Sequence, residues 1–64
     1  MKHGTYVGPD PQLKGERALL REGRHEGEVL VQFDNFSAQV ENTPMAFGWT
    51  AFPKASFSID EDAQ

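Results

Sequence analysis

The chain has 64 residues, which suffices for one small domain and is too short for two. It contains no cysteine, and this excludes disulfide bridges, thiolate metal sites and cysteine nucleophiles. A net charge of −4 opposes the basic footprint of non-specific nucleic-acid binding, whereas five Phe, one Trp and one Tyr are enough for a single small core.

Hydropathy gives no sign of a membrane segment. The longest strongly apolar run is Val29-Leu30-Val31, far below the roughly 20 residues that span a bilayer. The first six residues lack the apolar segment of a secretory signal. We therefore expect a cytoplasmic protein that makes no contact with a membrane.

Residues 1–14 are expected to form an irregular N-terminal arm. The residues that interrupt helices and strand ladders there are Gly4, Gly8, Pro9 and Pro11. Tyr6 and Val7 have the character of residues that close the edge of a small sheet, so they can still attach the arm to the core.

Residues 16–22 permit two interpretations. Their composition favours a helix, but a helix this short is marginal alone. At a period of two, Ala18 and Leu20 face one side of a strand, while Arg17 and Arg21 face the other. Because the chain that follows is clearly β-structure, a strand is predicted here.

The clearest strand signal covers residues 28–34. Val29, Val31 and Phe33 share one face, and β-branched residues favour this setting. The preceding residues 23–27 begin and end with glycine and are polar between, which predicts a compact turn.

The remaining elements are shorter. Residues 36–41 alternate as a second, weaker strand that either pairs with the preceding one or forms a loop. Residues 47–52 predict a strand with a bulge at Gly48, and residues 57–59 predict one more. The acidic residues 60–64 are expected to form a frayed tail.

Four or five short strands, frequent turn signals and no convincing helix predict an all-β domain that closes as a small antiparallel barrel. Its core is expected to consist of Ala18, Leu20, Val29, Val31, Phe33, either Ala51 or Trp49, and Phe57.

Three segments resemble parts of SH3-like barrels. Residues 15–21 look like a first strand in which a glycine precedes a charged pair and an apolar run. Residues 28–34 resemble the valine-leucine-valine strand of the SH3-like small subunit of photosystem I. Residues 52–59 look like the proline, short 3₁₀ turn and last strand that complete the fold. The resemblance covers roughly residues 15–59 and implies an SH3-like small β-barrel.

The departures from that family bear on function. Proline-peptide-binding SH3 domains carry a tandem tryptophan pair and an aromatic cluster in the first loop, whereas this chain has Trp49 alone and no aromatic between Tyr6 and Phe33. Gln32 stands where the photosystem subunit has arginine. The resemblance therefore implies the fold without its known activities. The small, acidic, cysteine-free chain also resembles uncharacterised proteins of bacteriophages and mobile elements.

Catalytic and metal-binding patterns are weak. His25 beside Glu26 has the composition of a general base, but no nucleophile signature accompanies the pair. The carboxylates lack the spacing and glycine of a calcium loop, and there is no phosphate-binding glycine motif. We therefore expect no enzymatic activity, no metal ion and no cofactor.

The aromatic residues are the most informative about function. More of them occur than one small core must bury: Phe33, Phe47, Trp49, Phe52 and Phe57. Phe36 lies where a loop should be polar, and exposed aromatics beside charges are typical anchors for a partner. We expect a non-enzymatic protein-protein interaction module, an accessory or regulatory factor, with Phe36 and Trp49 as anchors and Arg17 and Arg21 at the rim.

Two alternatives from other classes stay open. The acidic residues between positions 26 and 62 can mimic the charge of a nucleic acid and so inhibit a basic site on a host enzyme, in which case binding should weaken steeply with salt. A small barrel can also bind RNA or a single strand by stacking, although the net charge of −4 makes nucleic acid an unfavoured partner.

Overall fold

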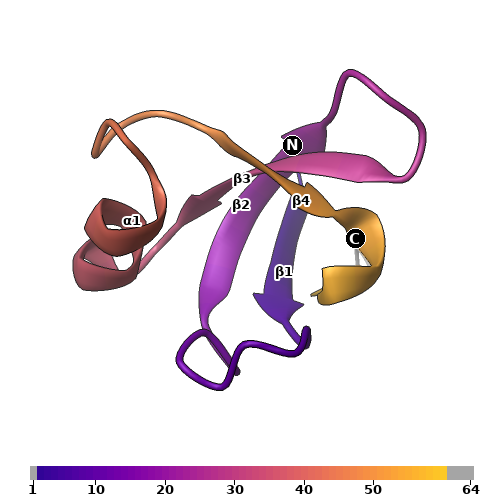
Figure 1. Ribbon diagram of the computed structural model, residues 1–64. Helices are drawn as coiled ribbons and strands as arrows, with labels where there is room; N and C mark the ends of the chain where they lie inside the picture. Colours follow the sequence, from indigo (N-terminus) through magenta and orange to yellow (C-terminus); the bar gives the residue numbers. More distant parts are fainter. Residues whose placement is uncertain (1, 61–64) are drawn as a thin grey trace.

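One curled sheet of five antiparallel strands forms most of the computed structural model, which describes residues 2–60 (Figure 1). The strands are β1 Lys2–Tyr6, β2 Arg17–Glu22, β3 Glu28–Phe33, β4 Thr50–Pro53 and β5 Phe57–Ile59. An α-helix, α1 Phe36–Asn42, joins β3 to β4, and a 3₁₀ turn, η1 Lys54–Ser56, joins β4 to β5. The strand order β4-β3-β2-β1-β5 makes a half-barrel that is compatible with an SH3-like small barrel. The all-β fold class is confirmed.

The segment with helix-forming composition is strand β2, as the period-two pattern predicted. Its register with β3 sets Ala18 opposite Phe33 and Leu20 opposite Val31. Because directly opposed residues project to the same face of a sheet, the apolar residues of both strands meet on the inner face. Pairing with a strand on each side therefore overrides the helix propensity of this segment.

The expectation of an irregular arm over residues 1–14 is wrong for its first part, because Lys2–Tyr6 is strand β1 between β2 and β5. Gly4 does not interrupt this ladder. A Cβ at Gly4 would lie 2.9 Å from both Leu20 Cδ1 and the Ser58 carbonyl oxygen, so the close packing of neighbouring strands requires glycine here. Tyr6 is buried, as its proposed attachment to the core requires, and the irregular stretch begins after it.

The weak strand expected over residues 36–41 is also wrong, because this segment is helix α1. Asn35 caps the helix: its Oδ1 accepts hydrogen bonds from the backbone N–H of Ser37 at 2.9 Å and of Ala38 at 3.4 Å. Such a cap supplies partners for N–H groups that a short helix leaves unpaired. Across residues 2–60, no helix combines the length and apolar character needed to cross a membrane.

The strand expected over residues 47–52 is shorter and shifted in the structure. It begins at Thr50 and extends to Pro53, one residue beyond the expected end at Phe52. Gly48 lies in a turn instead of a bulge, where its N–H donates to the Met45 carbonyl at 2.9 Å. The 3₁₀ turn and the last strand, Phe57–Ile59, are where the resemblance to SH3-like barrels placed them.

The core lies inside the curve of the sheet. Six of the expected residues are buried: Ala18, Leu20, Val29, Val31, Phe33 and Phe57. Three more join them, namely Tyr6, Leu13 and Ala38. Phe33 packs edge to face on Phe52 with ring centroids 5.7 Å apart, and Tyr6 packs in the same way on Phe57 at 5.4 Å. Neither Ala51 nor Trp49 belongs to this core, because Ala51 is exposed and Trp49 is only partly covered.

The first residue of the expected acidic tail is held by the sheet. The backbone N–H of Asp60 donates to the His3 carbonyl at 2.9 Å, and its carboxylate pairs with Arg17. Residues 61–64 of that tail lie outside the described residues.

Candidate functional site

The outer face of the sheet carries a stacked pair of an arginine and a tryptophan. Arg21 lies opposite Leu30 of β3, on the face that points away from the core. Trp49 immediately precedes β4, the next strand of the sheet. The Arg21 Cζ lies 5.0 Å from the centroid of the Trp49 ring, within the range of a cation-π interaction. The structure therefore brings together two of the four residues that the sequence analysis predicted as partner contacts.

The loop between α1 and β4 exposes two large apolar side chains. Met45 is 71% exposed and Phe47 is 84% exposed. Sequence reasoning missed both as contact residues, since it assigned Phe47 to a strand. The signal that could have found them is the turn sequence from Asn42 to Pro44 before this stretch, together with Gly48 after it.

This loop is nevertheless tied to the sheet and to the helix. Gln32 Nε2 donates to the Phe47 carbonyl at 3.1 Å. Gln39 is only 2% exposed, and its Nε2 donates to the Gly48 carbonyl at 2.9 Å while its Oε1 accepts from the Phe33 N–H at 2.7 Å. Gln39 thus connects β3, α1 and the loop through one side chain.

A second tie joins the two ends of the loop. The hydroxyl oxygens of Thr43 and Thr50 lie 2.8 Å apart, and Thr50 Oγ1 is 3.2 Å from the Asn42 carbonyl oxygen. Hydrogen bonds hold the backbone of this loop at both ends and at Gly48. The exposed side chains of Met45 and Phe47 therefore project from an ordered backbone. We name Arg21, Met45, Phe47 and Trp49 the loop surface.

The other two nominated residues lie elsewhere. Arg17 begins β2, and its guanidinium pairs with the Asp60 carboxylate at 2.6 Å and donates to Thr5 Oγ1 at 2.8 Å. The hydrogen bond to Asp60 raises the pKa of Arg17, and the same hydrogen bond lowers the pKa of Asp60. Phe36 stands in the first turn of α1 and is 63% exposed.

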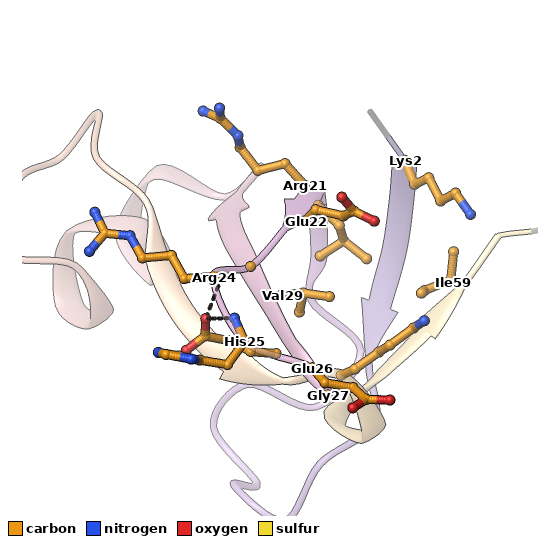
Figure 2. A pocket seen from close by; sticks show the side chains of 13 residues that line it. Lys2, Arg21, Glu22, Arg24, His25, Glu26, Gly27, Val29 and Ile59 are labelled. Atoms are coloured by element: carbon orange, nitrogen blue, oxygen red, sulfur yellow. Dashed lines mark hydrogen bonds between the residues drawn. The ribbon is translucent and has the colours of Figure 1, made fainter.

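A hollow of about 690 Å³ opens at the hairpin between β2 and β3 (Figure 2). We name it the hairpin hollow. Its apolar lining is Leu20, Val29 and Ile59. Its charged lining is Lys2, Arg21, Glu22, Arg24, Glu26, Glu28 and Lys54, with His25 from the turn. Arg21 is therefore shared between the hairpin hollow and the loop surface.

The hairpin turn is held by an acidic side chain. Glu28 Oε1 accepts from the backbone N–H of Arg24 at 2.8 Å and of His25 at 3.3 Å. The neighbouring Gly27 has a φ of +79°, a conformation that favours glycine. His25 and Glu26, the pair with the composition of a general base, thus lie in a turn at the edge of the hollow.

The acidic residues do not form one uninterrupted surface. Asp34 and the His3 ring are hydrogen-bonded at 2.8 Å and Asp60 pairs with Arg17, so two carboxylates of the expected charge mimic already have side-chain partners. A smaller hollow of about 200 Å³ gathers Asp10, Glu16 and Glu41 between α1 and the loop that follows β1. Among residues 2–60, no three His, Asp or Glu residues gather closely enough to hold a metal ion.

Comparisons with protein-family models, with curated proteins and with solved structures yield no match to this chain. The function is therefore inferred from the geometry of the described residues.

Proposed function

We propose that the protein is a non-enzymatic SH3-like interaction module that docks onto another protein through the loop surface and acts as an accessory or regulatory factor. The observation that carries this proposal is the exposure of Phe47 on a loop whose backbone is fixed by Gln32 and Gln39. An aromatic ring left in water offers a large apolar area to a partner. Because the loop is already ordered, binding costs little further conformational entropy.

The pair of Arg21 and Trp49 supports the same interpretation. The guanidinium stacks on the indole, which orders both side chains and leaves the edge of the guanidinium able to donate hydrogen bonds. Trp and Arg are the residue types that most often dominate the energy of an interface. Phe47 is the apolar anchor in this proposal, and Arg21 with Trp49 is the polar and aromatic rim.

The other two predicted contact residues, Phe36 and Arg17, contribute differently to the proposed interface. Phe36 stays a proposed second contact because it is exposed on α1. Arg17 contributes less than the sequence suggested, because Asp60 already occupies its guanidinium. We assign the module to the cytoplasm, a reducing compartment that suits a chain without cysteine.

The test is quantitative capture of partners from the native cell with the full chain as bait, followed by mass spectrometry. Phe47→Ala and Trp49→Ala should each weaken capture of the same partner by about tenfold or more, since interface hot spots are few and large. Val7→Ala is the matched control, because Val7 is an exposed apolar residue at 52% outside the loop surface. Circular dichroism of each variant should overlay that of the native chain.

Salt separates this proposal from the charge mimic. The part of the affinity that the aromatic residues of the loop surface supply should persist when salt rises from about 0.05 M to about 0.5 M, because apolar contacts are not screened. A partner that is retained by both aromatic variants, but lost at high salt and on changing Asp10, Glu16 and Glu41 to their amides, would reject the loop surface in favour of the acidic one.

A further inference from the structure

The hairpin hollow gathers most of the positive charge of an acidic protein. Four of the six Lys and Arg residues line it, namely Lys2, Arg21, Arg24 and Lys54. Because Glu22, Glu26 and Glu28 line it too, its lining carries a net charge of +1, whereas the whole chain carries −4. Within residues 2–60 the ion pairs are His3 with Asp34 and Arg17 with Asp60, so none of the four cations takes part in one. Their charge is available to a ligand.

The arrangement of these cations restricts the kind of anion. In Figure 2 the side chains of Arg21 and Arg24 extend to one side of the hollow and that of Lys2 to the other, so the three head groups do not converge on one point. A single phosphate or sulfate would need several donors that converge on one point. Cations that diverge around an opening of about 690 Å³ suit an extended ligand whose negative charges are also separated. Nearby Glu28 competes little, because its Oε1 already accepts from the hairpin backbone.

The lining of the hollow also has an apolar part. Ile59 is the apolar side chain of the lining that a ligand can reach, because it is half-buried, whereas Leu20 and Val29 are 2% and 6% exposed and belong to the core (Figure 2). A ligand that carries charge alone would leave this part without a contact. An acidic peptide that also carries an apolar side chain can place its carboxylates at the rim and that side chain against the aliphatic groups.

We propose that the partner of the loop surface presents an acidic peptide segment containing an apolar residue, and that this segment lies in the hairpin hollow. This inference rests on the proposed function and names the chemistry of the partner. The link is Arg21, which stacks on Trp49 and also lines the hollow, so one ligand can contact both surfaces without a gap. The acidic remainder of the protein repels such a segment and so directs it to the hollow.

The test uses a fluorescein-labelled octapeptide, Glu-Glu-Leu-Glu-Glu-Phe-Glu-Glu, titrated with the full chain and followed by fluorescence anisotropy. The same peptide with Gln in place of each Glu is the neutral probe. The acidic peptide should bind at least about tenfold more tightly than the neutral one at low salt, and this advantage should shrink as salt rises. Equal binding of the two probes would overturn the inference.

Single charge removals locate the site. Arg24→Gln and Lys54→Gln should each weaken binding of the acidic peptide by about fivefold. Lys14→Gln is the matched control, because Lys14 is an exposed cation outside the hollow, and it should change the affinity by less than about twofold. All three side chains are exposed, so these variants should fold normally. An equal loss with Lys14→Gln would show non-specific attraction and would overturn the inference.

Two competitors test other anions. Inorganic tripolyphosphate and a single-stranded oligothymidylate should displace the acidic peptide only weakly, because neither offers an apolar side chain on a peptide backbone. Displacement by either one at the concentration at which unlabelled acidic peptide competes would assign the hollow to polyphosphates and overturn the peptide proposal.

Failure of this inference is distinguishable from failure of the proposed function. If capture from the cell is lost with Phe47→Ala while Arg24→Gln and Lys54→Gln bind the acidic peptide normally, the loop surface stands and the hollow is not the peptide site. If capture survives Phe47→Ala and Trp49→Ala but is lost with Arg24→Gln, the loop surface is overturned and acidic recognition in the hollow stands by itself.

Discussion

The inner face of the sheet and the segment of residues 35–49 are stabilised by different interactions. On the inner face, rings meet edge to face and aliphatic side chains fill the space between them, so that Ala18 and Val31 are wholly buried. In residues 35–49, side-chain amides and hydroxyls bind backbone groups, with Asn35 and Gln39 as the main examples. The inner face therefore depends on a repeated pattern of residue types, whereas the segment of residues 35–49 depends on single residues at particular positions.

The same local pattern leads to opposite structures in these two regions. At a period of two, residues 17–22 place Ala18 and Leu20 on one face and residues 36–41 place Phe36, Ala38 and Val40 on one face, yet the first segment is a strand and the second a helix. Strand β2 has a hydrogen-bonded neighbour on each side. The segment after β3 instead begins with Asn35, whose side chain caps a helix, and its buried polar residue is Gln39. Alternation alone does not distinguish these cases.

Removing a core ring should have the largest effect. Phe33 is 4% exposed and packs on Phe52 and Phe57. We expect Phe33→Ala to lower the free energy of unfolding by about 3 to 5 kcal/mol, because transfer energy is lost and a cavity is left behind. Urea denaturation followed by Trp49 fluorescence measures the change. Phe36→Ala is the control and should have little effect, since Phe36 is exposed.

A Phe33→Ala variant that unfolds at the same urea concentration as the native chain would contradict the assignment of the inner face. That assignment depends on the register of β2 with β3, which sets Ala18 opposite Phe33. A shift of one residue would carry Phe33 to the outer face.

Removing the central hydrogen bonds of residues 35–49 should have the next largest effect. We expect Gln39→Met, which keeps the shape of the side chain, to cost about 1 to 3 kcal/mol, because the Phe33 N–H loses its partner and the Gly48 carbonyl keeps only the longer hydrogen bond from Gln32 Nε2 at 3.4 Å. Gln12→Met is the control, because Gln12 is exposed. Hydrogen exchange of the Gly48 amide should quicken in Gln39→Met only. Unchanged exchange and stability would show that Gln39 does not hold the loop.

The helix cap should contribute less than Gln39. Asn35→Ala removes the acceptor for the N–H groups of Ser37 and Ala38, and we expect it to cost about 1 kcal/mol. Asn35→Asp keeps an oxygen at the same place and should retain most of the stability. Thermal unfolding of both variants checks this order. Equal losses in Asn35→Ala and Asn35→Asp would mean that capping is not what stabilises α1.

The sequence predicted the inner face well because burial repeats along each strand. Ala18, Leu20, Val29, Val31 and Phe33 were all assigned to the core from a period of two, and all are buried. Strand β1 was missed because Gly4 looks like an interruption in the sequence. Only the position of Leu20 above it shows that glycine is needed for packing.

The candidate site was predicted less completely. Arg21 and Trp49 were nominated from residue type and are in contact. Their contact depends on the order of strands in the sheet, which places β4 next to β3. A local sequence pattern does not predict which strands are neighbours. Met45 and Phe47 were missed because Phe47 was assigned to a strand, and because the glutamines that hold the loop lie outside it. The hairpin hollow was missed for a similar reason, since Lys2 and Lys54 join it from opposite ends of the chain.

The smallest effect is expected from the pair that joins the C-terminal end of the described chain to β2. The hydrogen bond from Arg17 lowers the pKa of Asp60, so folding favours the ionised carboxylate. Such a group stabilises the fold above the aspartate pKa of the unfolded chain, and this contribution disappears as the pH falls through the lower pKa of the folded state. Stability should therefore decline below about pH 4 in part because Asp60 becomes protonated.

Asp60→Asn isolates that contribution. Near neutral pH the variant should be slightly less stable than the native chain, because both side chains of the pair are 46% exposed and water screens their attraction. As the acid is titrated the difference should shrink, since the native Asp60 then also lacks its charge. In an Arg17→Gln background the substitution should have a much smaller pH-dependent effect in this range, because Arg17 is the main cause of the lowered pKa of Asp60. Urea denaturation at a series of pH values gives these differences, and one that grows toward low pH would contradict the lowered pKa of Asp60.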